Sequence, residues 1–104
     1  MSAESQRMML RERQTEEGLL VAVCDSAILG ETFEGGEVSL TVTEEFYAGE
    51  EVGPDAVRDA LLRADVANIV GTASVGLAIE IGVVEEGNVL AVGSTRHAQL
   101  VRLY

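Results

Sequence analysis

The pattern of hydrophobic and polar positions predicts a first set of strands, a central pair of helices and a last set of strands. Residues 65–85, DVANIVGTASVGLAIEIGVVE, contain the longest apolar run of the chain, and glycines interrupt it. Apolar residues recur there at helical spacing, as at Val66, Ile69 and Val70. The pattern therefore predicts a helical segment over residues 65–81 that packs beneath a sheet.

Strands are predicted on both sides of this segment. Residues 8–14 and 19–24 form a first hairpin, and because LLVAVC is apolar at every position, its second strand should be covered on both faces. Residues 38–42 alternate apolar and polar, as a half-buried strand does. Residues 88–92 and 96–104 form a second hairpin.

A further helix is predicted over residues 54–64, because Pro54 suits the first helical position and apolar residues follow at helical spacing. Strands, then helices, then strands predict an α+β fold, in which a mainly antiparallel sheet of about five strands has helices 54–64 and 65–81 on one face. A chain of 104 residues supports one core. We expect a single domain over residues 8–104, preceded by a flexible segment, residues 1–7.

The chain is strongly acidic, with 18 Asp and Glu against 7 basic residues, all of them Arg, and a net charge of −11. Such a surface repels itself, and molar salt, where the Debye length is about 3 Å, screens the repulsion. We interpret the composition as adaptation to a salty cytosol, that is, as halophilic. The alternative is recognition of a basic partner, such as a ribosomal protein.

The absence of a signal or membrane segment, together with a single cysteine, favours the cytoplasm. No apolar run is long enough to span a membrane, and the charged start lacks the apolar part of an export signal. One cysteine and one histidine are too few for a typical zinc site, and the glycine spacing matches no phosphate-binding motif. The sequence predicts neither a metal nor a cofactor.

Three residues could form a nucleophilic site, namely Cys24, Asp25 and His97. Cys24 and Asp25 follow a predicted central strand, and His97 could act as the base of a small hydrolase or transferase. The alternative is structural and is preferred. It makes Cys24 an inert core thiol, Asp25 the cap of the turn that follows, and His97 an edge-strand residue.

Binding surfaces are predicted at three places. Phe46 and Tyr47 lie between pairs of glutamates in a connection, so they form either a contact surface or a small core, with Phe46 tucked in and Tyr47 outward. Asn68, His97 and Gln99 could line a cleft. A basic, nucleic-acid-binding patch could include Arg7, Arg11, Arg13, Arg96 and Arg102 if the first and last strands are neighbours. Alternatively, these arginines balance nearby glutamates.

Five short segments carry a resemblance to a known family. They are CDSAILG (24–30), EEFYAGE (44–50), ANIVG (67–71), AIEIGVV (78–84) and STRHAQ (94–99). Their order and spacing resemble the archaeal domain-of-unknown-function family 424. The resemblance implies a small archaeal single-domain protein with no assigned reaction, and a loose association with translation genes. We therefore expect a non-enzymatic binding module with a protein or ribonucleoprotein partner, with no DNA or membrane partner. The alternative is the small hydrolase or transferase that uses Cys24, Asp25 and His97.

Overall fold

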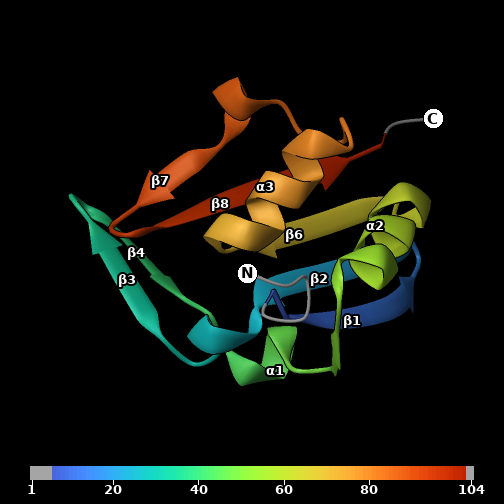
Figure 1. Ribbon diagram of the computed structural model, residues 1–104, viewed down its shortest axis with the longest axis horizontal. Helices are drawn as coiled ribbons and strands as arrows, with labels where there is room; N and C mark the ends of the chain where they lie inside the picture. The colour runs from blue at the N-terminus through green and yellow to red at the C-terminus, as the bar shows by residue number, and fades with distance from the viewer. Residues whose placement is uncertain (1–5, 103–104) are drawn as a thin grey trace.

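The structure, a computed structural model, describes residues 6–102 and is built on a mixed six-stranded sheet (Figure 1). The strand order is β5-β1-β2-β6-β8-β7. The strands are β5 (Glu50–Val52), β1 (Met8–Thr15), β2 (Gly18–Asp25), β6 (Val66–Val70), β8 (Thr95–Val101) and β7 (Leu90–Val92). A separate hairpin joins β3 (Thr32–Gly35) to β4 (Val38–Thr41). The helices are α1 (Glu44–Tyr47), α2 (Pro54–Arg63) and α3 (Thr72–Glu80), with 3-10 turns η2 (Ser26–Ile28) and η3 (Glu86–Asn88).

The sheet is mainly antiparallel, as predicted. Its one parallel pair joins β2 and β6, with Leu20 opposite Val66 and Cys24 opposite Val70. The neighbouring pairs β1–β2, β1–β5, β6–β8 and β7–β8 are antiparallel. A parallel pair needs a crossover connection, and α2 lies within it. The α+β class is therefore confirmed.

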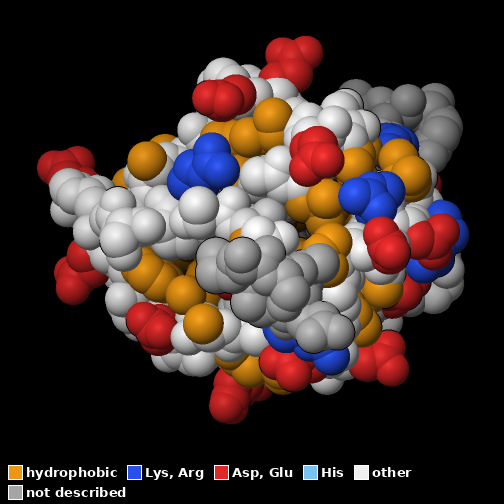
Figure 2. All heavy atoms as spheres, viewed as in Figure 1, with side chains coloured by type: hydrophobic (Ala, Val, Ile, Leu, Met, Phe, Trp, Pro, Cys, Tyr) orange, Lys and Arg blue, Asp and Glu red, His pale blue; other side chains and the backbone are white. Residues whose placement is uncertain are grey.

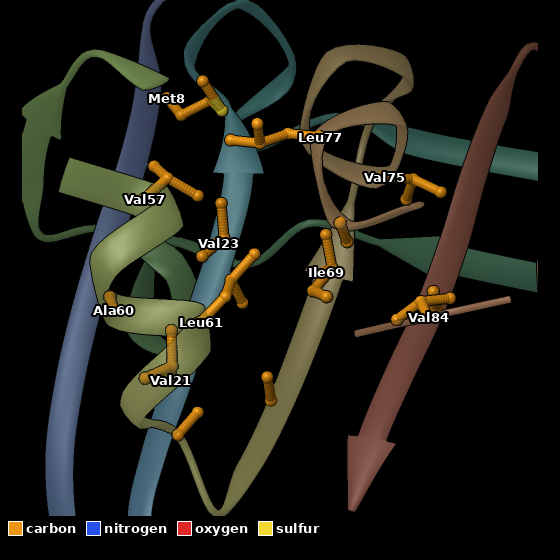
Figure 3. Packing of buried hydrophobic residues seen from close by; sticks show 14 of the residues in the cluster. Met8, Val21, Val23, Val57, Ala60, Leu61, Ile69, Val75, Leu77 and Val84 are labelled. Atoms are coloured by element: carbon orange, nitrogen blue, oxygen red, sulfur yellow. The ribbon is translucent and has the colours of Figure 1, made fainter. Parts of the chain in front are cut away.

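Helices α2 and α3 cover one face of this sheet, which we call the helix face. Figure 3 shows Leu61 of α2 and Val75 of α3 on the same side as Val21, Val23 and Ile69 of the central strands, and all five are fully buried. Helix α2 begins at Pro54, as its sequence predicts, and its apolar stripe faces β1 and β2. Burial of these aliphatic side chains stabilises the fold by about 1.5–3 kcal/mol each.

Residues 66–70 were expected to begin a helix, and this expectation is wrong because they form strand β6. Three of the five residues are β-branched, and so short an apolar run fits a buried strand as well as a helix. β6 lies between β2 and β8, so its backbone groups have partners on both sides. The helix predicted over 65–81 is thus only α3, Thr72–Glu80.

The opposite face of the sheet is covered at one end only. A second cluster of buried side chains joins Cys24 and Val70 of the sheet to Tyr47 of α1 and to Val42, which follows β4. The hairpin β3–β4, of which only the strand at residues 38–42 was predicted, lies at this end (Figure 1). Of the predicted flexible segment, residues 1–5 lie outside the described residues, and β1 begins at Met8 as expected. Among the helices of residues 6–102, none is long and apolar enough to cross a membrane.

Candidate functional site

Asp25 ends β2 and holds the start of α3. Its Oδ1 accepts hydrogen bonds from the backbone N–H of Ser74 (2.8 Å) and from the Ser74 hydroxyl (2.7 Å), and its Oδ2 accepts one from Ala73 N–H (3.1 Å). A carboxylate at this place satisfies free N–H groups and complements the helix dipole. Asp25 was expected to cap the turn that follows it. This is wrong, because η2 has no side-chain cap and the carboxylate caps α3 instead.

Gly71 allows this close contact. Its φ of +116° is in the region that favours glycine, and a Cβ at this position would lie 2.4 Å from Cγ of Asp25. Gly71 separates β6 from α3, because the chain turns there from strand to helix.

Two clefts adjoin Asp25 at the carboxyl end of the parallel pair. One, of about 690 Å³, lies between the start of α2 and the length of α3 and is lined in part by Pro54, Thr72 and Glu80. The other, of about 440 Å³, is lined in part by Arg7 and Ser26. Ligands of α/β sheets often bind at this end of the strands. Here, however, the Asp25 carboxylate is occupied by its three hydrogen bonds to α3.

Cys24, Asp25 and His97 do not form a nucleophile and its base. Cys24 is fully buried, and burial, followed by the charge of Asp25, raises the pKa of its thiol to about 12. His97 lies two strands away from Cys24, because Val70 of β6 is between these two residues. Two strand spacings separate their backbones by roughly 10 Å. The Asp25 carboxylate contacts α3 on the helix face. The thiol therefore stays protonated at neutral pH and has no base beside it.

The uncovered part of the sheet brings together side chains from four strands. Cross-strand partners point to the same face, so the register places Arg11, Ala22, Asn68 and Gln99 in one row, next to the row of Cys24, Val70 and His97. We call the uncovered residues of this face the open sheet face. They are Arg11, Arg13, Leu20, Val66, Asn68, His97, Gln99 and Val101.

Polar contacts fix several of these side chains. Gln99 Nε2 donates a hydrogen bond of 2.8 Å to Asn68 Oδ1, a contact that ties β8 to β6. The guanidiniums of Arg11 and Arg13 both donate to the backbone oxygen of Glu45 in α1. Within residues 6–102, neither arginine has a carboxylate within ion-pair distance. Partial burial lowers the pKa of His97, which keeps its ring neutral at pH 7.

The two aromatic residues of α1 differ in exposure. Tyr47 is buried, and burial raises the pKa of its hydroxyl to about 12. Phe46 is half-buried, lies edge-on to Tyr47 at 4.9 Å between ring centroids, and has the Arg13 guanidinium 5.4 Å from its own centroid. The expectation that Tyr47 points outward is therefore wrong, whereas Phe46 packs against the second cluster as expected. Only Phe46 adds to the edge of the open sheet face.

The five predicted patch arginines do not form one surface. Strands β1 and β8 are separated by β2 and β6, so the condition for the patch is not met. The guanidiniums of Arg96 and Arg102 contact carbonyl oxygens of α3 and of the end of α2, on the helix face. Arg11 and Arg13 lie on the opposite face, and Arg7 adjoins the cleft near Ser26. Glu12 pairs with Arg63 at 3.0 Å and not with any of the five.

Sequence reasoning missed Leu20, Val66 and Val101 as members of this face. The sequence contained only part of the information needed to find this face. The alternation of side chains in β1 places Arg11 and Arg13 on the same side, but no local pattern shows which strands lie beside it. A hollow of about 250 Å³ on the same side is lined by Thr15, Glu17, Leu20 and Val66. Within residues 6–102 there is no group of three His, Cys, Asp or Glu side chains able to hold a metal ion.

Comparisons with known proteins agree with this fold. No curated protein matches the chain. A crystal structure of an uncharacterized conserved protein from Methanopyrus kandleri is similar, with 24% sequence identity, a TM-score of 0.74, and coverage of 94% of this chain and 96% of that one. The family described as protein of unknown function (DUF424) matches residues 12–103, which confirms the resemblance in the sequence. The chain therefore belongs to the DUF424 family.

Proposed function

We propose that the protein is a non-enzymatic binding module and that the open sheet face is its binding surface. The observation that carries the proposal is the distribution of charge. Of the residues of β1, β2, β6 and β8 that face this side, none is Asp or Glu, although the whole chain has 18. Figure 2, which views the molecule with α3 in front, has acidic side chains around its outline.

The chemistry of the open sheet face suits a protein partner. Its centre consists of the neutral amides of Asn68 and Gln99, flanked by Leu20, Val66 and Val101, and the residue Val101 is 59% exposed. Protein interfaces are depleted of charge at their cores and enriched in Arg, as here at Arg11 and Arg13. Apolar contacts and amide hydrogen bonds also persist in salt that screens ion pairs.

We place this function in a salt-adapted cytoplasm, with a component of the translation apparatus as the partner. The acidic, lysine-free composition supports the salt adaptation, and the translation partner is what the resemblance of the five short segments implies. A nucleic-acid partner is less suited, because only Arg11 and Arg13 offer cations on this face, and each phosphate contact is weakened by salt.

Co-sedimentation with purified ribosomes in molar KCl tests the proposal. We expect the wild type in the ribosomal pellet. Asn68→Asp should weaken binding by about tenfold, because it places a carboxylate at the neutral centre of a surface that has none and leaves an oxygen to accept from Gln99. Ala56→Glu is the matched control, since it adds one carboxylate at an exposed position of α2. Wild type that stays in the supernatant, or equal effects of the two variants, would contradict the proposal.

A further inference from the structure

Strand β8 has a free edge over part of its length. It runs from Thr95 to Val101, and β6 pairs with it from His97 to Val101. On its other side, β7 pairs only with Thr95, Arg96 and His97. Residues 98–101 therefore have a neighbouring strand on one side alone within the part of the chain that the structure describes.

The backbone groups that point to this edge belong to Gln99 and Val101. The carbonyl oxygen of Arg96 accepts a hydrogen bond from Gly71 N–H (2.9 Å), and the N–H of Arg102 donates one to the carbonyl oxygen of Asp65 (2.8 Å). The even-numbered residues of this strand therefore direct their backbone N–H and C=O groups towards the β6 side. In an antiparallel strand the direction alternates with each residue. The N–H and C=O of Gln99 and Val101 therefore face outward, and both residues are exposed.

This edge lacks the protection that edge strands usually carry. Natural sheets protect an edge with charged side chains, proline or a bulge. The edge at the other end of the sheet, β5, has Glu50 and Glu51. Residues 98–101, AQLV, have neither charge nor proline, although charged residues make up 24% of the chain. A free edge without a charge is the form that accepts a further strand.

We propose that an extended peptide segment of the partner pairs with β8 through the outward N–H and C=O groups of Gln99 and Val101. This inference rests on the proposed binding function and specifies the form of the partner. Main-chain hydrogen bonds hold such a strand, and alternate side chains give specificity. Alternate side chains of the added strand would extend the open sheet face beside Gln99 and Val101.

The charge of β8 indicates what kind of peptide fits. β8 and the residue after it contain the cations Arg96 and Arg102 and no carboxylate, in a chain with a net charge of −11. An acidic, aliphatic strand therefore meets less repulsion here than elsewhere on the surface. A second copy of this chain fits less well, because two bodies of this net charge repel each other and their β8 strands carry the same basic residues.

A library of linear peptides displayed on phage, selected against the whole protein, tests this inference. We expect acidic, aliphatic sequences to be enriched. A selected peptide, added to the wild type, should slow amide hydrogen exchange at Gln99 and Val101, which a contact through side chains alone would not do. Val101→Pro removes an outward N–H without removing a bond to β6, and it should weaken peptide binding by about tenfold or more. Val101→Thr is the matched control and should bind within about twofold of the wild type.

Each other outcome would overturn the inference. No enriched peptide, or enriched peptides that leave exchange at Gln99 and Val101 unchanged, would exclude strand pairing even if Val101→Pro failed to fold. A dimer in sedimentation equilibrium that Val101→Pro dissociates would assign the edge to a second copy instead. If ribosome binding depends on Asn68 while no peptide is selected, the strand inference fails and the binding function stands. If the wild type binds neither ribosomes nor peptides, both fail.

Discussion

Replacing Asp25 by alanine tests the tertiary contact that joins the end of β2 to the start of α3. The substitution removes both oxygens that accept hydrogen bonds from Ala73 N–H, Ser74 N–H and the Ser74 hydroxyl. Ser74 is fully buried, so its hydroxyl cannot exchange the lost partner for bulk water. The first turn of α3 also loses the negative charge that complements its dipole.

The loss can be estimated from these contacts. Removing a side chain that caps a helix costs about 0.5–2 kcal/mol. Leaving a buried hydroxyl without an acceptor adds about 1–3 kcal/mol. The two effects share one residue and are not additive, so we expect Asp25→Ala to lower the free energy of unfolding by about 2–4 kcal/mol. Asp25→Asn keeps one acceptor oxygen and should lower it by about half as much.

Urea denaturation followed by circular dichroism, at one fixed concentration of KCl, measures these differences. Asp59→Ala is the control, because Asp59 forms an exposed ion pair with Arg63 at 3.0 Å, and such pairs contribute about 0–1 kcal/mol. For a chain of this size, a loss of 2 kcal/mol also lowers the melting temperature by about 10 °C. If Asp25→Ala loses no more stability than Asp59→Ala, the carboxylate does not hold α3, and the reasoning is refuted.

Three further predictions concern single positions. Gly71→Ala should cost more than about 1 kcal/mol in the same denaturation experiment, because φ is +116° and a Cβ would meet the Asp25 carboxylate; an unchanged urea midpoint would contradict this. Cys24 should resist iodoacetamide at about pH 8 until urea unfolds the chain, since burial raises its pKa to about 12, and rapid alkylation of the folded protein would be the contrary result. Burial lowers the pKa of His97 in the folded protein below its ordinary value of 6.5. As the pH drops below about 6.5, the unfolded chain therefore binds a proton at His97 before the folded protein does, and the free energy of unfolding falls. His97→Gln should remove this part of the pH dependence, and denaturation at about pH 7.5 and 5.5 shows whether the wild type and the variant differ as expected.

Local sequence was sufficient where a single element carries its own signals. Helix α2 follows from Pro54 at its first position and an apolar stripe at helical spacing, and it begins where predicted and ends at Arg63, one residue before the predicted end. Residues 19–24, which are apolar at every position, were expected to form a strand covered on both faces. Val21 and Val23 are buried on the helix face and Ala22 and Cys24 on the other, whereas Leu20 lies on the open sheet face. In both cases the period of the side chains decides which residues are buried.

Residues 66–70 show where local sequence was not sufficient. Val66, Ile69 and Val70 match a helical period, but Ala67 and Ile69 lie on the helix face and Val70 on the other, as in any strand. A short apolar run permits both structures. The choice depended on pairing with β2 and β8, and these lie far from β6 in sequence.

The candidate surface also depended on strand order. The residue types were visible in the sequence, including Asn68, His97, Gln99 and the arginines of β1. The order β5-β1-β2-β6-β8-β7 decided that Asn68 lies beside Gln99, that Arg96 and Arg102 are on the other face from Arg11 and Arg13, and that Cys24 is separated from His97. Each of these relations joins residues more than 20 positions apart in the chain, and no local periodicity encodes them.

The sequence alone therefore determined the α+β class, the aliphatic core, the acidic surface and the family, because these follow from composition, side-chain period and short motifs. The tertiary structure alone decided which face stays uncovered, which helix Asp25 caps and which edge of the sheet is free. These features depend on which distant strands pair with each other. The hydrogen bonds of that pairing join backbone groups, which are the same in every sequence, so the local sequence does not specify the partner.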